Sequence, residues 1–123
     1  MRLVYLAAPV GAPTAAGVTE NLQRAKRWLR WAYLAHPDVS PIAPWITCCE
    51  VLDDANVQHR RRGLECDFAA IERCDELWLV GGRTSSGMEL EAKHARKTWR
   101  PVWGSPIRIV DLTHLGDEPP EIP

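Results

Sequence analysis

The sequence predicts an α/β protein in which a mostly parallel sheet of roughly five strands lies between layers of helices. Two apolar runs, at residues 2–8 and 76–80, have the near-continuous hydrophobicity of strands that are buried on both faces. A segment with helical spacing of apolar residues follows each run, and the same alternation continues along most of the chain. Such alternation is typical of parallel strands that are joined by crossover helices.

The first half of the chain predicts two strands and one long helix. Residues 2–8 (RLVYLAA) form the first strand, and the segment Pro9 to Pro13 interrupts it. Thr19 is the expected N-cap of a helix that runs to about Ala35. Its inward stripe is expected to be Leu22, Ala25, Leu29, Ala32 and Tyr33. Residues 39–45 form a second strand, and the two prolines within it favour an edge position or a short element.

The second half predicts a helix and three more strands. Residues 46–54 fit either a helical turn or a loop, and a helix is expected over residues 58–73 with Leu64, Phe68 and Ile71 inward. The further strands are expected at residues 76–80, 101–103 and 107–112. Residues 116–123 are acidic and proline-rich, which indicates a loose tail after a single domain at residues 1–115. Together the elements predict a flavodoxin/Rossmann-like three-layer sandwich.

The turn at residues 83–87 (RTSSG) is the strongest candidate for a binding site. It leaves the carboxyl end of a predicted parallel strand and opens a helix, and such turns bind ligands in α/β sheets. The backbone amides and the dipole of the helix favour an anion there. Ser86 and Glu89 fit the Ser-x-x-Glu capping box, which favours a structural role for Glu89. Glu91 has no such role: this segment alone favours a solvated side chain, and a position near the helix end would favour its ionised form, which suits a nucleophile.

Composition and charge exclude several classes of function. The 123 residues carry a formal net charge of −1, so neither nucleic acid nor a membrane surface is an expected partner. The cluster at residues 60–62 (RRR) is best interpreted as a solvated helix face, ahead of a nucleic-acid patch or a phosphate clamp. Four cysteines without Cys-x-x-Cys spacing or clustered histidines predict no metal site and favour reduced thiols in the cytoplasm. No segment has the length of a membrane span or the form of a signal peptide.

Nucleotide cofactors of the common kinds are also disfavoured. The first loop, residues 9–13 (PVGAP), has neither the G-x-G-x-x-G fingerprint nor a Walker sequence. In a doubly wound sheet this loop should lie beside the turn at residues 83–87. The residues expected to contact substrate across these two loops are Ala8, Pro9, Gly11, Ser85, Ser86 and Gly87.

Five short motifs occur in a fixed order, and they are Tyr5-Leu6-Ala7-Ala8-Pro9, Asn21 with Ala25, Pro41-Ile42-Ala43-Pro44, Cys74-Asp75-Glu76-Leu77, and Ser86-Gly87-Met88 followed by Glu91 and Ala95. This set resembles the nucleoside 2-deoxyribosyltransferase-like superfamily. The last two motifs are most similar to the small proteins of the DUF4406 group. The similarity extends over about residues 2–103, and the order and spacing of the motifs are more specific than any one of them.

The resemblance implies roles for particular residues. Glu91 corresponds to the glutamate that attacks the anomeric carbon of a deoxyribosyl group, and Asp67, 24 residues upstream, to the acid that helps the base to leave. Tyr5 corresponds to a tyrosine near the sugar, and Asn21 to the asparagine of the first helix. Ser85 holds the position at which related deoxynucleoside-monophosphate glycosidases meet phosphate. The chemistry needs no metal or redox cofactor, and the resemblance also implies a homo-oligomer.

Three positions depart from the family pattern. Ala8 replaces a glycine, Val10 lies near the place of an arginine, and Trp45 replaces a common histidine. An arginine from residues 60–62 or Arg83 would have to supply the missing charge. These departures leave the substrate open and allow that catalysis has been lost.

The sequence therefore leaves three classes of function open. The first is an N-glycosidase or deoxyribosyltransferase-like enzyme that acts on a nucleoside or nucleotide through a covalent intermediate at Glu91, with retained configuration. The second is a non-catalytic nucleotide-binding module that uses the same crevice. The third is a phage or host interaction protein whose working part is a tryptophan-rich surface, which could equally be a homo-oligomer interface. The tryptophans expected on that surface are Trp28, Trp31, Trp45, Trp99 and Trp103.

Overall fold

The computed structural model describes residues 1–100 and 104–122, and its centre is a four-stranded parallel sheet. The strands are β1 (Arg2–Ala7), β2 (Val39–Ile42), β3 (Glu76–Leu79) and β6 (Arg108–Asp111). Their order is β2-β1-β3-β6, so β2 is an edge strand, as the prolines of the expected second strand predict. This strand ends at Ile42, three residues before its expected end, and a helix begins at Pro44. The sequence predicts about five strands, whereas four form this sheet among the described residues.

A short hairpin stands apart from the sheet. Strand β4 (Trp99–Arg100) pairs antiparallel with β5 (Ser105–Pro106). The strand expected at residues 101–103 lies outside the described residues. The strand expected at residues 107–112 is β6, which pairs parallel with β3 and places Ile109 opposite Leu77.

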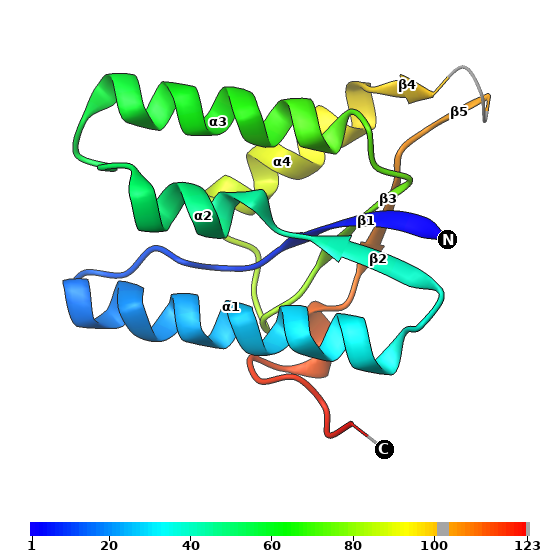
Figure 1. Ribbon diagram of the computed structural model, residues 1–123, viewed down its shortest axis with the longest axis horizontal. Helices are drawn as coiled ribbons and strands as arrows, with labels where there is room; N and C mark the ends of the chain where they lie inside the picture. Colours follow the sequence, from blue (N-terminus) through cyan, green and yellow to red (C-terminus); the bar gives the residue numbers. More distant parts are fainter. Residues whose placement is uncertain (101–103, 123) are drawn as a thin grey trace.

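Helices cover both faces of the sheet (Figure 1). Helix α1 (Ala15–Ala35) lies on one face, and α2 (Pro44–Val51), α3 (Val57–Ile71) and α4 (Ser86–Lys97) lie on the other. A 3₁₀ turn, η1 (Thr113–Leu115), follows β6. The sequence had left residues 46–54 open between a helical turn and a loop; most of this segment belongs to α2. None of the helices described is both long and apolar enough to cross a membrane.

Helix α1 begins five residues earlier than the sequence analysis expected. Thr14, and not Thr19, is its N-cap, because the Thr14 hydroxyl accepts a hydrogen bond of 3.0 Å from the amide of Gly17. The hydroxyl of Thr19 instead donates to the carbonyl of Ala15 within the helix, at 3.1 Å. The expected inward stripe is confirmed except for Tyr33, which is exposed; Trp28 and Trp31 are buried in addition to it.

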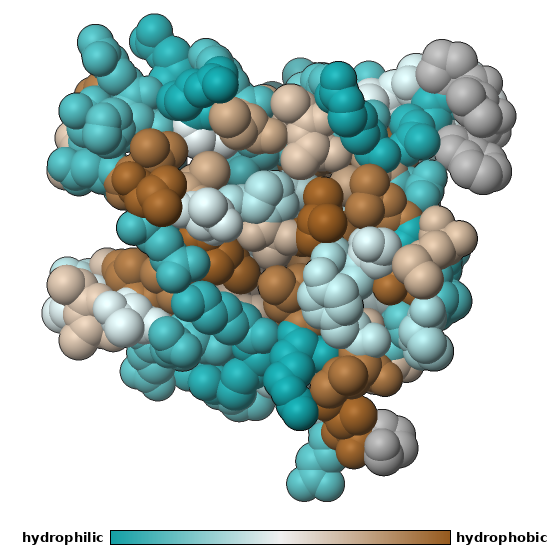
Figure 2. Space-filling model, viewed as in Figure 1, coloured by the Kyte–Doolittle hydropathy of each residue, from teal (hydrophilic) through white to brown (hydrophobic). Residues whose placement is uncertain are grey.

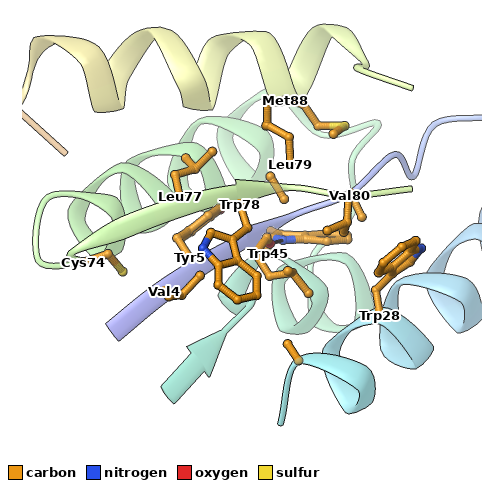
Figure 3. Close-up of a cluster of buried hydrophobic side chains, with 14 of the residues drawn as sticks. Val4, Tyr5, Trp28, Trp45, Cys74, Leu77, Trp78, Leu79, Val80 and Met88 are labelled. Carbon is orange, nitrogen blue, oxygen red and sulfur yellow. Dashed lines mark hydrogen bonds between the residues drawn. The ribbon is translucent and has the colours of Figure 1, made fainter. Parts of the chain in front are cut away.

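The tryptophans form part of the core and do not make a surface patch. Trp28, Trp31, Trp45 and Trp78 are all buried, and Trp28 and Trp31 pack edge to face with ring centroids 5.4 Å apart. Figure 3 shows three of them, Trp28, Trp45 and Trp78, among the aliphatic side chains of the sheet. Trp99 is exposed, and Trp103 lies outside the described residues. The expected tryptophan-rich surface is therefore wrong for three of its five members, and the interaction-protein hypothesis loses its main support.

The segment after residue 115 is attached to the domain, in contrast to the loose tail that was expected. Glu118 accepts hydrogen bonds from Arg24 and Arg27 of α1, and the indole of Trp28 donates to the carbonyl of Asp117 at 2.8 Å. Ile122 packs against the core. Proline-rich composition alone does not reveal such contacts, because they depend on the basic face of α1, which is hydrophilic in Figure 2.

Candidate functional site

A cavity of about 140 Å³ opens beyond the carboxyl end of β1, on the side of the sheet that carries α2, α3 and α4. This is where parallel α/β sheets bind ligands. Its wall combines apolar groups with a few charged side chains. The residues that line it are Ala8, Val10, Trp45, Cys48, Cys49, Leu52, Asp54, His59, Arg60, Gly63, Leu64, Asp67, Ser85, Gly87, Met88 and Glu91.

Glu91 lines the cavity and is hydrogen-bonded to Tyr5. Its neighbours on the buried face of α4 are Met88, Ala92 and Ala95, at the spacing of one helical stripe. The side chain of Tyr5 is fully buried beneath the cavity on β1, and its hydroxyl donates a hydrogen bond to Oε2 of Glu91. The solvated glutamate that the local sequence favoured is therefore wrong, because Glu91 is only 9% exposed.

Asp67 lines the same cavity from α3. Its buried position continues a stripe with Gly63 and Ile71, and the residue is 8% exposed. Its Oδ1 atom is buried without a hydrogen-bond partner among the described residues. A buried polar atom without a partner is unfavourable, and such atoms in a cavity mark a place where a ligand can bind. The alternative of a solvated Asp67 is excluded.

Burial is the largest influence on the pKa values of Glu91, Asp67 and Tyr5. Desolvation raises the pKa of Glu91 to about 7, the Tyr5 hydrogen bond lowers it, and the charge of Asp67 raises it. Desolvation likewise raises the pKa of Asp67 to about 6. The expectation that the helix end would favour an ionised Glu91 is wrong in direction, because desolvation raises the pKa of this carboxyl group. The pKa of Tyr5 is raised by burial and by Glu91, so its phenol stays protonated and remains a donor.

The start of α4 differs by one residue from the expected capping box. Ser85 is the N-cap: its hydroxyl accepts from the amide of Met88 at 3.3 Å, and its own amide donates to the sulfur of Met88 at 3.3 Å. Met88 therefore has the role in the capping box that was expected of Glu89, whose side chain is exposed. Ser86 is the first helical residue and not the cap. Ser85 and Gly87 both line the cavity.

A family model described as "Domain of unknown function (DUF7768)" matches residues 2–104. The chain belongs to the DUF7768 family. The matched segment contains every residue that lines the cavity. No curated protein matches the chain.

The predicted site residues of this DUF7768 domain fall into three groups. Ala8, Asp67, Ser85, Gly87 and Glu91 line the cavity, and Tyr5 contacts Glu91 beneath it. Pro9 and Asn21 line a second cavity of about 380 Å³ on the α1 side. Gly11 and Ser86 line neither of these two cavities.

Asn21 has a clear structural partner in this DUF7768 domain. Its amide nitrogen donates to the carbonyls of Val10 and Gly11, at 3.0 and 3.3 Å. Asn21 therefore fixes the loop between β1 and α1. Of the arginines considered for an anion, Arg60 lines the first cavity and Arg83 the second.

Several cavity residues were not anticipated as part of the site, and half of them come from α2 and the loop that follows it. They are Cys48, Cys49, Leu52, Asp54, His59, Gly63, Leu64 and Met88. Burial raises the pKa of Cys49 to about 11, so this thiol is neutral near pH 7. Trp45 was noted only as a departure; its indole donates to the carbonyl of Leu6 at 2.7 Å. The missing signal was that of α2 itself, since eight residues are too few for a clear periodicity. Within the part of the chain that the structure describes, no three metal-ligating side chains are grouped as they would be around an ion.

Proposed function

We propose that this DUF7768 protein is an N-glycosidase or deoxyribosyltransferase-like enzyme that cleaves the N-glycosidic bond of a nucleoside or nucleoside 5'-monophosphate. The observation that supports it best is the convergence of Glu91, Asp67 and Tyr5 at one cavity. These residues come from three elements and are far apart in the sequence. The resemblance of the motifs to nucleoside 2-deoxyribosyltransferase-like proteins gives the substrate class.

Glu91 is the nucleophile of the proposed reaction. The Tyr5 hydrogen bond holds its Oε2, which leaves Oε1 to attack the anomeric carbon. The carbon–nitrogen bond to the base breaks, and its electron pair goes to the base. A glycosyl ester forms on Glu91, and water or a second base then displaces it with retained configuration overall.

Asp67 supplies the proton that the departing base takes. Its raised pKa, about 6, keeps part of the population protonated near neutral pH, and its Oδ1 has no competing partner among the described residues. In the second step the ionised Asp67 accepts a proton from the attacking water. Ser85 and the amides at the start of α4 bind a 5'-phosphate when the substrate has one.

Release of free base tests the proposal directly. A panel of 2'-deoxynucleosides and their 5'-monophosphates is incubated with the wild type, Glu91→Gln, Glu91→Ala and Glu89→Gln. Glu89 is the matched control, because it lies in the same helix and is exposed. We expect turnover by the wild type and by Glu89→Gln, and none by the Glu91 variants. Equal turnover by Glu91→Gln would remove Glu91 from the mechanism.

A second substrate tests the roles of Asp67 and Glu91 separately. A 2-deoxyriboside with a nitrophenolate leaving group needs no proton on departure. It should restore turnover to Asp67→Asn but not to Glu91→Gln. Failure to restore it would count against Asp67 as the general acid.

The alternative is a module that binds a nucleotide without turnover. It is favoured by the pKa of Glu91 of about 7, because a half-protonated carboxyl is a weak nucleophile but a good hydrogen-bond donor. This alternative predicts thermal stabilisation by nucleotides in the absence of base release. We also infer a flavodoxin-like fold, since the order β2-β1-β3-β6 reproduces the first four strands of that topology.

A further inference from the structure

The buried side chains of the first cavity offer hydrogen-bond acceptors but no free donor. Among the lining residues, Asp67, Glu91 and Trp45 are the buried ones with oxygen or nitrogen in their side chains. The indole N–H of Trp45 already donates to the carbonyl of Leu6. Oδ1 of Asp67 has no partner among the described residues, and the bond from Tyr5 occupies only Oε2 of Glu91. A ligand that satisfies these carboxyl oxygens must therefore bring donors.

No positive charge of the protein balances the two buried carboxyl groups. Burial raises the pKa of Asp67 to about 6. Burial also raises the pKa of Glu91 to about 7, while the bond from Tyr5 lowers it and the charge of Asp67 raises it. No basic side chain of the described chain is among these influences. Buried carboxyl groups without a counter-charge are unfavourable, and such groups occur mainly at functional sites.

The charged and polar groups that can donate belong to less buried residues of the same cavity. Arg60 and His59 are exposed, as is the acidic Asp54, and Ser85 is half-buried. The ring of His59 accepts at Nδ1 from the amide of Asp53, at 3.0 Å, so its proton is on Nε2. The cavity thus has acceptors at its buried residues and donors at its exposed ones. A ligand that matches this order has its donor-rich, positive end inside.

An amidinium group has the shape and charge that a buried carboxylate requires. Its two nitrogen atoms lie in one plane, as in a guanidinium, and their N–H groups pair with a carboxylate through two parallel hydrogen bonds. The exclusion of water from buried groups strengthens such a pair. A metal ion fits less well, because no three metal-ligating side chains are grouped in the part of the chain that the structure describes.

We propose that the cavity binds the amidinium edge of a ligand, with the carboxyl group of Asp67 accepting its hydrogen bonds and that of Glu91 adding a second negative charge. On the proposed function, on which this step rests, the edge belongs to a nucleobase that carries an amino group. Adenine presents N1 and its 6-amino group, and cytosine N3 and its 4-amino group. The proton of Asp67 moves to the ring nitrogen, so the base becomes the cation and Asp67 the anion. Hypoxanthine and uracil have a carbonyl oxygen in place of the amino group, and that oxygen faces another acceptor.

Three small ligands of one shape and different charge test the site without any nucleoside. They are acetamidinium, acetamide and acetate, and their affinities are measured at pH 8 by NMR of the aspartate and glutamate side-chain carboxyl carbons. We expect the wild type to bind acetamidinium about tenfold or more tightly than acetamide, and acetate most weakly. Saturation with acetamidinium should lower the pKa of Asp67 below about 6, because a cation favours the ionised form.

Two variants separate the buried carboxyl group from the general field of the cavity. Asp67→Asn should bind acetamidinium and acetamide equally, because the neutral amide keeps the shape of the side chain and loses its charge. Asp54→Asn is the matched control: Asp54 lines the same cavity but is exposed, so its charge is screened by water. It should keep most of the preference for acetamidinium.

Two pairs of nucleosides then test the base. They are 2'-deoxyadenosine with 2'-deoxyinosine, and 2'-deoxycytidine with 2'-deoxyuridine. The amino-bearing member of each pair should have the lower KM, and Asp67→Asn should reduce the difference in substrate binding.

Each contrary outcome has a definite meaning. Equal affinity of the wild type for acetamidinium and acetamide overturns the amidinium site, and this comparison needs no variant. The same loss in Asp54→Asn as in Asp67→Asn also overturns it, because a diffuse negative field would then explain the preference. Acetamidinium binding without turnover of any nucleoside or nucleotide overturns the proposed function and not the site. Turnover with equal KM values within both pairs overturns the choice of base and leaves the proposed function standing.

Discussion

Tyr5 and Glu91, 86 positions apart in the sequence, are joined by a buried hydrogen bond in which the phenol donates to the carboxylate. The two side chains come from the first strand and the last helix, so the bond exists only in the assembled domain. It is the one influence among the three that lowers the pKa of Glu91, while burial and Asp67 raise it. Tyr5 therefore holds the Glu91 carboxylate in place and favours its ionised form.

Tyr5→Phe should raise the pKa of Glu91 above about 7, because it removes the donor that stabilises the ionised form. An NMR titration of the glutamate side-chain carboxyl carbons measures this directly. For the proposed reaction, the acid limb of kcat/KM should move to higher pH in parallel. Tyr33→Phe is the matched control, since Tyr33 is 56% exposed. An unshifted Glu91 titration in Tyr5→Phe would show that the hydrogen bond does not hold the carboxylate in solution.

The stability of the protein should fall as the pH rises through the neutral range. Glu91 and Asp67 have folded pKa values of about 7 and about 6, above their ordinary values of 4.5 and 3.8. Between these limits the folded state binds more protons than the unfolded state, so the free energy of unfolding decreases with pH. The Glu91 contribution is on the order of 3 kcal/mol.

Glu91→Gln should remove most of this dependence and be more stable than the wild type at pH 8. Urea unfolding at pH 5, 6, 7 and 8 measures it. Glu89→Gln, at an exposed position of the same helix, should keep the wild-type slope. A wild-type free energy of unfolding that is constant between pH 5 and 8 would contradict the raised pKa values.

The sequence predicts the sheet well because buried parallel strands have a distinctive composition. The apolar runs that became β1 and β3 are adjacent in the sheet, and residues 4–7 of β1 and all of β3 are buried. Helix starts are harder to predict, since Thr14 and Thr19 are both acceptable caps and only the hydrogen bond to Gly17 decides. At the start of α4, Ser85 and Ser86 are likewise both acceptable caps, and the hydrogen bond from the Met88 amide to Ser85 decides between them.

The site could be predicted only in part. A solvated and a buried Glu91 have the same local sequence, and the difference arises from packing against Tyr5. Family resemblance, and not periodicity, led to the pairing of Glu91 with Asp67. Neither periodicity nor family resemblance indicates that Cys48 and Leu52 line the cavity, because their position depends on how α2 packs against α3.

Gly81 should tolerate alanine less well than Gly116, although both have a φ of 101°. A Cβ atom at Gly81 would lie 2.6 Å from Cδ of Pro9, whereas nothing lies within 4 Å of one at Gly116. In both variants the alanine must adopt a positive φ, which costs on the order of 1–3 kcal/mol. Gly81→Ala must in addition displace the rigid ring of Pro9, next to the cavity residue Ala8.

Chemical denaturation of both variants measures the difference. We expect Gly116→Ala to fold with a lower free energy of unfolding and Gly81→Ala to be lower still. Equal losses would show that the loop between β1 and α1 moves freely away from β3.

Glu118→Gln should release the segment 116–122 from α1 while the domain stays folded. Glu118 accepts from the guanidinium groups of Arg27, at 2.7 and 3.0 Å, and of Arg24, at 3.0 Å. These bonds, that of Arg27 first, lower the pKa of Glu118 to about 2. Because the folded pKa is depressed, the attachment is complete above about pH 4.5 and is lost as the pH falls toward 2.

Hydrogen exchange of the Trp28 indole N–H is a sensitive reporter, since that group donates to the carbonyl of Asp117 at 2.8 Å. It should exchange faster in Glu118→Gln than in the wild type at pH 7, and at 1 M salt the two should converge, because charges of this kind are then screened within about 3 Å. Glu121→Gln is the control: Glu121 is exposed on the same segment, and no cation pairs with it among the described residues. Equal protection of the indole in Glu118→Gln and in the wild type would mean that Asp117 and Ile122 alone hold the segment on α1.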